Sequence, residues 1–572
     1  MEQRPNDRWP RLTRRGFLAS TIAAALAACS SDGSESETSS PPTSSTAGAS
    51  TTSPSATGTT DSATDTSVET GAPGATSVTS DPFTLGVASG DPLPDSVILW
   101  TRLLPEEPLA DTDIEVTWEV ASDEEFTDVV IAGTAPAVAA LGHSVHVDAG
   151  GLAADTEYWY RFSVDGFTSM PARTRTFAAA GTMPDRFRFA FSSCQNWEQG
   201  YYAAYRDLVE QGDDAGGMDA FVFLGDYIYE YASGGYADEG SRLTGQDFEC
   251  ETLEQYRERY ALYHGDHLLQ GAHAFVPWII TWDDHEVDND YAGAVSENDD
   301  DRAAFLERRA AAYQAWYEHM PVRLDPPEGP DYEIYRSLTH GDLLRFHVLD
   351  TRQYRSDQQR GEPFVAPLGE AVQVRDDTLA DDPNHTMLGE AQRAWLIDGV
   401  TASDTVWDVL AQQVFMFGGN AVAGTDPPVV VVDTWDGYSG ERRVVLDALG
   451  AAADNLIVLT GDFHSAAVAD LRADPFDPAL PVVGTEFMAS SISSSFFDDD
   501  ATVETLVTGA LAGNPHLKWF DARRGYTVCE VTPERWVATY RAVEDQFDEM
   551  SPVSAVSSWE VLAGVPGVTQ LT

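Results

Sequence analysis

Lysine is almost absent from this chain of 572 residues, because Lys518 is the only one and every other basic residue is an arginine. No glycine-rich loop ends in Lys-Ser or Lys-Thr, so the sequence contains no P-loop for nucleotide phosphates. A Schiff base with substrate could form only at Lys518. The scarcity of lysine therefore excludes some common enzyme chemistries before any motif is considered.

Positive charge of any kind is scarce. There are 34 Lys and Arg against 93 Asp and Glu, which gives a formal net charge of -59. A nucleic-acid-binding protein needs a basic surface, so stable binding to DNA or RNA is not expected. The simplest interpretation of the acidity is a solvated surface suited to salty or calcium-rich surroundings. The 43% hydrophobic content and 14 Trp indicate a packed protein with more than one domain.

Residues 1–29 have the pattern of an export signal. Arg14-Arg15 opens a twin-arginine motif, and the apolar stretch behind it is too short to span a bilayer. Leu26-Ala27-Ala28-Cys29 resembles a lipobox, so we expect lipidation at Cys29 and location at the outer face of the membrane or secretion. The alternative is a plain secretory signal with an incidental cysteine. A membrane contact is expected only through this anchor, and a monomer is the working expectation.

Bulky apolar residues are nearly missing from residues 30–80, which are rich in Ser, Thr, Ala, Gly and Pro. Such a segment cannot bury enough surface to offset its ordering entropy, so we expect a flexible tether. Of the cysteines beyond it, Cys194 is a candidate ligand. If it is one, Cys250 and Cys529 form the only pair left, and the sequence does not decide whether they are bonded.

Residues 81–180 carry short segments of β character at the spacing of an antiparallel sandwich of the fibronectin type. The expected strands are 97–101, 114–120, 129–133, 144–147 and 157–164. His143 and His146 alternate along one of them and are interpreted as surface or packing residues. From Phe187 onward, strand and helix patterns alternate, with helices expected at 201–210 and 301–320, so residues 184–560 are predicted to form a layered α/β domain.

Polar residues follow three apolar runs in this second region, and α/β folds place ligands beyond the carboxyl ends of such strands. Residues 221–225 run into Asp226 and Tyr229. Residues 278–282 run into Asp284 and His285, and residues 456–461 run into Asp462 and His464. Taken singly, each of these is more often a turn residue, a buried hydrophobe or a surface hydrogen bond. Together they indicate a metal-dependent hydrolase.

Phosphoester cleavage needs a nucleophile formed at neutral pH and positive charge for the phosphoryl oxygens, which two neighbouring metal ions provide. Asp226 is the candidate bridge between them. Tyr229 and Cys194 favour an ion such as iron, whereas Asp284 and Asn289 offer hard oxygen atoms to calcium. Either of Asp462 and His464 could reach the cluster. His285 could protonate the leaving alkoxide or contact the phosphate.

The chain resembles the PhoD family of secreted alkaline phosphatases and phosphodiesterases, distant relatives of the purple acid phosphatases, from Asp81 to about Thr532. The motifs that carry the resemblance are Leu85-Gly86-Val87-Ala88-Ser89-Gly90-Asp91-Pro92, Leu99-Trp100-Thr101-Arg102, Ser193-Cys194-Gln195, Gly225-Asp226-Tyr227-Ile228-Tyr229-Glu230, Trp282-Asp283-Asp284-His285-Glu286-Val287, Leu388-Gly389-Glu390-Ala391-Gln392, Asp433-Thr434-Trp435-Asp436-Gly437-Tyr438, Gly461-Asp462-Phe463-His464-Ser465 and Gly484-Thr485-Glu486-Phe487. The resemblance implies a layered metallophosphoesterase domain of the α/β class behind the β-sandwich.

The resemblance also implies Fe3+ and Ca2+ as cofactors. It places five residues around iron, with Asp226 also facing calcium: Cys194, Asp226, Tyr229, Asp462 and His464. Where relatives carry Glu-Asn-Asn, this chain has Asp288-Asn289-Asp290, so Asn289 is kept and Asp290 departs from the family pattern. Candidate phosphate-binding arginines are Arg257 and Arg352, with Arg442 and Arg524 as further possibilities.

The expected function is a secreted alkaline phosphatase that releases phosphate from organic phosphomonoesters and also cleaves diesters. Asp226 would hold the metals and His285 would assist the leaving group. The alternative is a narrow phosphodiesterase or phospholipase acting on nucleotides or cell-wall polymers. A catalytically silent adhesive lipoprotein would lack one or more of the strand-end ligands, and none is missing here.

Overall fold

The computed structural model describes residues 77–214, 217–236, 242–298, 300–359, 372–422, 424–495 and 508–571. The predicted export signal, the lipidation site Cys29 and nearly all of the predicted tether lie outside these residues. None of the helices described here is long and apolar enough to cross a membrane.

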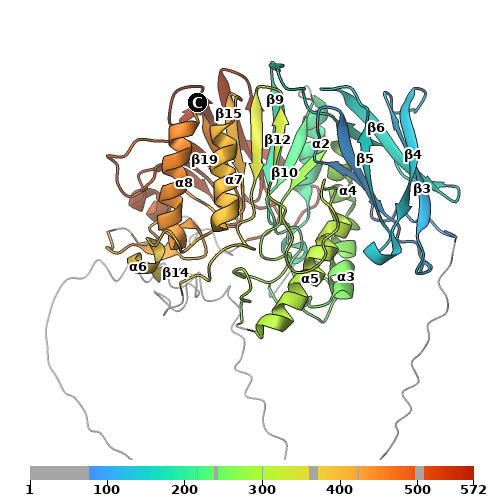
Figure 1. The fold of residues 1–572 in the computed structure, drawn as a ribbon, viewed down its shortest axis with the longest axis horizontal. Coiled ribbons are helices and arrows are strands. Elements are labelled where there is room, and N and C mark those ends of the chain that lie inside the picture. Colours follow the sequence, from blue (N-terminus) through green and yellow to red (C-terminus); the bar gives the residue numbers. More distant parts are fainter. Residues whose placement is uncertain are drawn as a thin grey trace, which may run out of the picture.

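Two large mixed sheets dominate the chain (Figure 1). The first has the order β24-β23-β22-β21-β9-β10-β11-β1-β2-β5 and the second the order β12-β13-β15-β17-β19-β18-β20. The strands of the first are β1 Val87–Gly90, β2 Ser96–Arg102, β5 Ser144–Gly150, β9 Phe187–Ser192, β10 Ala220–Phe223, β11 Trp278–Ile280, β21 Gly525–Val531, β22 Arg535–Val543, β23 Val553–Leu562 and β24 Thr569–Leu571. Those of the second are β12 Arg336–His340, β13 Leu344–Val348, β15 Trp407–Ala411, β17 Leu456–Thr460, β18 Ala466–Leu471, β19 Gly484–Met488 and β20 Leu517–Asp521.

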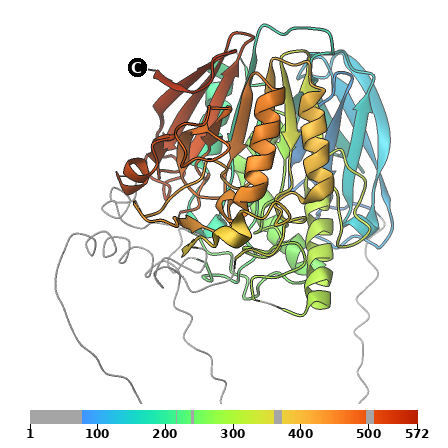
Figure 2. The same ribbon diagram turned by 60° about the vertical axis from the view of Figure 1, so that its left-hand side comes forward.

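The two sheets pack face to face, and helices cover both outer faces, so the domain has four layers (Figures 1 and 2). Between the sheets, Phe189 of β9 meets Phe346 of β13 edge to face at 5.4 Å between ring centroids. The helices are α2 Ala203–Asp214, α3 Leu253–His264, α4 His267–Phe275, α5 Arg302–His319, α6 Asp377–Ala380, α7 Gly389–Thr401 and α8 Ser439–Ala452, with short 3-10 turns η1 Ala139–Leu141, η2 Trp197–Gln199 and η4 Trp435–Tyr438. The predicted layered α/β class is confirmed.

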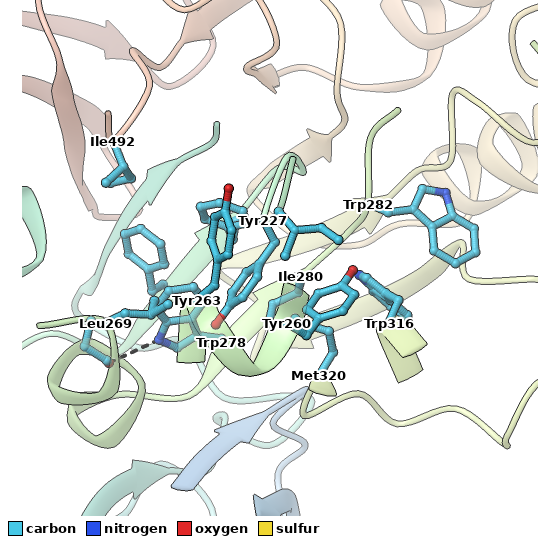
Figure 3. Packing of buried hydrophobic residues seen from close by; sticks show 14 of the residues in the cluster. Tyr227, Tyr260, Tyr263, Leu269, Trp278, Ile280, Trp282, Trp316, Met320 and Ile492 are labelled. Atoms are coloured by element: carbon cyan, nitrogen blue, oxygen red, sulfur yellow. Dashed lines mark hydrogen bonds between the residues drawn. The ribbon is translucent and has the colours of Figure 1, made fainter. Parts of the chain in front are cut away.

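Aromatic side chains fill the layer between the first sheet and helices α3 to α5 (Figure 3). Trp278 of β11 is fully buried there, and its indole donates a hydrogen bond of 3.1 Å to the carbonyl of Ala272. Trp282 stacks on Tyr313 of α5 with ring centroids 4.0 Å apart. These large rings fix the strand end that leads into Asp283 and Asp284.

Helices α3, α4, α5 and α6 begin where short polar side chains accept from free backbone amides. Thr252 and Gln255 form a reciprocal capping box at α3, and Asp301 accepts from two amides at the start of α5. The predicted helices at 201–210 and 301–320 correspond to α2 and α5.

A smaller sheet at the N-terminal side has the order β4-β3-β6-β7, with β8 paired to β6. Its strands are β3 Ile114–Ala121, β4 Val129–Ala137, β6 Glu157–Val164, β7 Phe167–Thr168 and β8 Ala172–Arg175, and a separate pair joins β14 Val372–Val374 to β16 Val429–Val431. The expected N-terminal β-rich region is therefore present. Its second layer, β1, β2 and β5, is continuous with the first large sheet, since β1 pairs in parallel with β11 at Gly90 and Trp278.

His146 and His143 are packing residues in this region, as the sequence indicated. His146 stacks on Tyr317 of α5 at 4.3 Å, and burial lowers its pKa to about 4. His143 contacts the carbonyl of Ala110 at 3.1 Å. The cysteines of the described chain, Cys194, Cys250 and Cys529, are all free, so the open question of a bond between the last two is answered in the negative.

Candidate metal centre

The candidate ligands gather where the carboxyl ends of both large sheets meet. Strands β9, β10 and β11 are parallel neighbours, and β17 runs parallel to both of its neighbours in the second sheet. A parallel bridge between Ser193 and Ser491, with a hydrogen bond from the amide of Ile492 to the carbonyl of Ser193, joins the regions beyond the strands. Residues far apart in the sequence therefore meet at one edge.

Tight left-handed turns aim these side chains inward. Four candidate ligands have positive φ, namely Cys194 at 56°, Asp226 at 59°, Asp462 at 62° and His464 at 47°. Such conformations are uncommon for residues other than glycine and persist only where the surroundings enforce them. Gly225, at φ 103°, precedes one of these turns, and a Cβ there would lie 2.4 Å from the Cβ of Asp283. The turn after β10 therefore needs glycine for both conformation and space.

The buried carboxylate of Glu286 ties two of the turns together. It accepts hydrogen bonds from the amides of Asp226 at 3.0 Å, Tyr227 at 2.6 Å and Asp283 at 2.8 Å. One side chain thus fixes the backbone after β10 and after β11 in a single arrangement.

Cys194, Asp226 and His464 place one sulfur, one oxygen and one nitrogen atom within 4.8 Å of one another, and all three are buried. The hydroxyl of Tyr229 lies 3.0 Å from Oδ2 of Asp226 and 3.0 Å from Nε2 of His464. These four side chains therefore form one mixed cluster that a single ion could occupy.

A second group consists of Asp226, Asp284 and His285, so Asp226 belongs to both groups. Among the described residues, no hydrogen-bond partner reaches the buried Oδ1 of Asp226. A buried carboxylate oxygen without a partner is costly, and a cation between the two groups would satisfy it.

Two all-carboxylate groups adjoin the second one, and both contain Asp284. The first adds Asp283 and Asp462, and the other adds Asp290 and Asp433. The guanidinium of Arg352 lies among them: its Nε contacts Asp283, Nη1 lies 2.8 Å from Asp433, and Nη2 lies 3.2 Å from Asp462 and 3.5 Å from Asp284. One fully buried cation therefore holds four acidic side chains together.

The pKa values follow from burial and from this crowding. Burial raises the pKa of Asp226 well above its ordinary value, and the carboxylates of Asp284 and Glu286 add to the effect. Burial likewise raises the pKa of Cys194 and of Tyr229, with Asp226 as the second cause for both. Burial opposes the ionisation of Asp284, but Arg352 and His285 outweigh it and hold its pKa well below the usual range. Without a bound cation, Asp226, Cys194 and Tyr229 therefore favour their protonated forms, whereas Asp284 favours its carboxylate form.

The remaining predicted residues fall in different places. Asn289 donates from its side chain to Glu297 at 2.8 Å and from its backbone to Glu230 at 2.9 Å, which puts it in the network around His285. Arg524 donates to the carbonyl of Ser494, whose hydroxyl donates to Tyr229.

Two arginines proposed for phosphate have other partners. Both Nε and Nη2 of Arg257 lie 2.6 Å from the carboxylate of Glu318 on α5, so the structure does not bring this residue to the cluster. Arg442 pairs with Asp436 at 2.7 Å. The prediction of a substrate role for Arg257 lacks support from this geometry because its charge is already neutralised by a buried carboxylate.

Several residues of the centre were not singled out from the sequence: Asp283, Asp433, Glu230 and Glu286. Asp283 stands beside Asp284, and Glu230 directly follows Tyr229 in the motif after β10. A carboxylate neighbouring a candidate ligand was the available signal. What it could not reveal is that both adjacent acids, Asp283 and Asp284, belong to the centre and share Arg352 as a partner.

The donor chemistry fits metal ions. Thiol, phenol, imidazole and carboxylate donors meet in the group around Cys194, which suits a trivalent or softer transition-metal ion. The groups around Asp284 offer mainly carboxylate oxygens, which suits a hard cation such as calcium.

Comparison with known proteins adds an independent finding. The family model described as PhoD-like phosphatase matches residues 189–540, and the model of the PhoD-like phosphatase N-terminal domain matches residues 66–178. Alkaline phosphatase D of Bacillus subtilis (strain 168) is 42% identical over 469 residues, covering 81% of this chain and 78% of that protein. A solved structure of PhoD superposes with a TM-score of 0.80 at 39% identity, over 87% of this chain and 94% of that one.

Proposed function

The chain belongs to the PhoD-like phosphatase family and is an alkaline phosphatase by that homology, and we propose that it is an exported enzyme that uses Fe3+ and Ca2+ to hydrolyse phosphomonoesters and phosphodiesters. Water attacks phosphorus, the bond from phosphorus to the ester oxygen breaks, and that oxygen leaves as an alcohol.

The single observation that supports a two-metal reaction best is the position of Asp226 in two adjacent donor groups, with a buried oxygen that lacks a partner in the described part of the chain. A bound metal pair would supply a nucleophile from water at neutral pH and would neutralise the phosphoryl oxygens. The chain's own part is to hold the donor atoms in place, through Glu286 and through the turn at Gly225.

His285 is proposed to donate the proton that the leaving oxygen requires. Its ring is buried and stacks on Tyr229 at 4.0 Å, and its Nδ1 lies 2.7 Å from Glu230. That contact orients the ring and leaves Nε2 as the nitrogen available for proton donation, so in this proposal His285 acts as the acid and Asp226 and Asp284 hold the second ion without it. Burial opposes protonation of His285, but in the metal-free protein the carboxylates of Glu230, Asp226 and Asp284 outweigh it and raise its pKa.

The identity of the metals is supported by donor type. A thiolate and a phenolate from Cys194 and Tyr229 favour iron, and the carboxylates around Asp284 favour calcium. Export by the twin-arginine route, with Cys29 as a lipid anchor, is supported by the residues 14–29. A folded protein could acquire its metals before crossing the membrane by that route.

The test is metal content together with visible absorption, on protein exported in its native host. Iron bound to phenolate or thiolate colours a protein, so the Cys194→Ala variant is expected to shift or lose the absorption band together with the activity. Cys250→Ala is the matched control, because Cys250 is also a free, buried thiol but is not part of the cluster. A colourless, iron-free wild-type enzyme that still cleaves esters would overturn the metal assignment and leave the reaction intact.

The breadth of substrate is tested separately. Comparing p-nitrophenyl phosphate with bis(p-nitrophenyl) phosphate keeps the leaving group constant, so the ratio of kcat/KM reports monoester against diester preference. Cleavage of both supports the proposal. Cleavage of the diester alone would establish the alternative of a narrow phosphodiesterase.

A further inference from the structure

Two tyrosines follow the candidate ligand Tyr229 and border the site. The ring of Tyr236 meets His285 edge to face with centroids 5.5 Å apart, and it lies 6.4 Å from His464. Tyr231 lies 5.7 Å from His285 and 5.7 Å from Tyr236. Both tyrosines are partly exposed, whereas the histidines they touch are buried. The two rings therefore form an uncharged wall beside an otherwise acidic centre.

The position of this wall is fixed by Glu198, a buried residue of η2. Its carboxylate accepts hydrogen bonds from the hydroxyl of Ser233 at 2.9 Å, the amide of Gly234 at 2.9 Å and the amide of Thr244 at 2.9 Å. The amide of Ser233 also donates to the carbonyl of Gln246 at 2.7 Å. The backbone immediately before Tyr236 is thus anchored to the segment that follows Cys194.

The position of Tyr231 and Tyr236 beside His285 determines which part of the substrate these two rings contact. If His285 protonates the leaving oxygen, that oxygen lies within hydrogen-bonding distance of its ring. The carbon substituent on that oxygen must then extend past the side chains that surround His285, and Tyr231 and Tyr236 are two of them. Flat rings pack on tyrosine in stacked or edge-to-face arrangements that a polyol cannot reproduce.

We propose that Tyr236, together with Tyr231, forms the leaving-group subsite of this enzyme and favours phosphoesters whose leaving group is an aromatic ring. Aryl phosphates and esters with a base close to the phosphate belong to this class. The proposal rests on the proposed function, in particular on His285 as the proton donor. The rings are neutral, so they do not repel a negatively charged substrate as the surrounding carboxylates do.

The test compares phenyl phosphate with glycerol 2-phosphate in wild type, Tyr236→Ala and Tyr236→Phe, each loaded with metal. Losing the ring is expected to lower kcat/KM for phenyl phosphate about three- to tenfold, carried mainly by KM, which is the range for an aromatic pair. The value for glycerol 2-phosphate should change less than about twofold, since a polyol passing the ring cannot make the stacked or edge-to-face contact that an aromatic group makes. Tyr236→Phe keeps the ring and should match wild type on both substrates.

The matched control is Tyr335→Ala, a partly buried tyrosine that packs on Tyr354 and Trp395 instead. This variant should leave unchanged the ratio of kcat/KM for phenyl phosphate to kcat/KM for glycerol 2-phosphate. The subsite would be overturned if Tyr236→Ala lowered kcat/KM equally for both substrates. It would also be overturned if Tyr236→Phe lowered kcat/KM for phenyl phosphate as much as Tyr236→Ala does.

A measurement on the wild-type protein guards against a variant that fails to fold. Phenylphosphonate should inhibit the wild type several-fold more strongly than methylphosphonate, and equal inhibition would contradict the subsite. Failure of the metal-loaded wild type on both esters would instead refute the proposed function, so the two failures are distinguishable.

Discussion

Glu230 and His285 form a buried pair in which Oε2 of the glutamate lies 2.7 Å from Nδ1 of the histidine. The other carboxylate oxygen accepts from the backbone amide of Asn289 at 2.9 Å. Glu230 is the last residue of the motif that carries Asp226 and Tyr229, so the segment that supplies these ligands also orients the proposed acid. A carboxylate behind a histidine fixes both the tautomer and the direction of the ring.

Replacing Glu230 by Gln should therefore impair proton donation more than metal binding. We expect kcat to fall about tenfold or more for an alkyl phosphate, whose leaving oxygen needs a proton, within the range of general acid catalysis. For p-nitrophenyl phosphate, whose leaving group departs as a stable anion, the loss should be much smaller.

The measurement is kcat across a series of esters with leaving groups of different acidity. A steeper dependence on leaving-group acidity in Glu230→Gln supports the pairing, and unchanged metal content shows that the site is intact. A uniform loss across the series would mean that Glu230 acts only on the fold.

Arg352 connects four carboxylates in the interior, so its removal should destabilise the metal-free protein strongly. Breaking a buried charge network by removing one partner costs about 3–5 kcal/mol. We expect the free energy of unfolding of Arg352→Met to fall by this amount in chelator, and added calcium to restore a part of it because the cation takes over some of the charge.

Arg442→Met is the control for this experiment, since Arg442 is equally buried but pairs with Asp436 outside the cluster. Urea unfolding with and without calcium should show a calcium-dependent recovery in Arg352→Met alone. The same recovery in both variants would argue against a special link between Arg352 and the cation site.

The pH dependence of stability should differ in sign between metal-free and metal-loaded protein. Burial raises the pKa of Asp226 and Asp462 well above their ordinary values, and it raises the pKa of Glu286 to about 8. The folded, metal-free protein then binds more protons than the unfolded chain, so its free energy of unfolding falls as pH rises towards and through these folded pKa values. Metal binding needs ionised ligands, so it should release protons and strengthen with rising pH.

Urea unfolding at pH 7 and pH 9 checks this expectation. This window avoids the buried histidines His264, His273 and His319, whose lowered pKa values act in the opposite direction below the ordinary histidine pKa. We expect the metal-free form to lose on the order of 1–3 kcal/mol between the two pH values. Buried thiols such as Cys250 and Cys529 contribute to the pH dependence of stability in both the metal-free and the metal-loaded protein. The difference in pH dependence between the two forms therefore reports the metal centre alone. Equal slopes in both forms would contradict the assignment.

The sequence predicted the elements of the fold closely wherever a local pattern decides them. The strand expected at 157–164 is β6, and the helix expected at 301–320 is α5, because β character along a strand and apolar repeats along a helix are local signals. The continuity of β1 with β11 was not predictable, since pairing between strands nearly 190 residues apart leaves no local trace.

The same distinction applies to the site. The strand-end pattern was sufficient to find Asp226, Asp284 and His464, which the structure brings into adjoining groups. Arg257 and Arg352 looked equivalent in the sequence, yet one pairs with Glu318 and the other lies among the acids of the centre. The partner of a buried charge depends on tertiary packing, which no single-residue pattern contains.

Gly225 provides a test of the backbone that holds the centre. At φ 103° an alanine would be strained, and its Cβ would lie 2.4 Å from the Cβ and 2.5 Å from the amide nitrogen of Asp283. That nitrogen cannot move easily because it donates to Glu286. We expect Gly225→Ala to lower the free energy of unfolding by about 3 kcal/mol or more and to reduce metal content, combining strain with overpacking.

The matched control is Gly166→Ala, in the turn between β6 and β7. Gly166 has φ 88°, and a Cβ added there would meet nothing within 4 Å. Gly166→Ala therefore introduces backbone strain but no steric clash. Its cost should be about 1–2 kcal/mol with metal content unchanged. Urea unfolding and metal analysis of both variants separate the two contributions. If Gly225→Ala costs no more than Gly166→Ala and still binds metal, the turn tolerates displacement, and the fixed contact between Gly225 and Asp283 is not what positions Asp226.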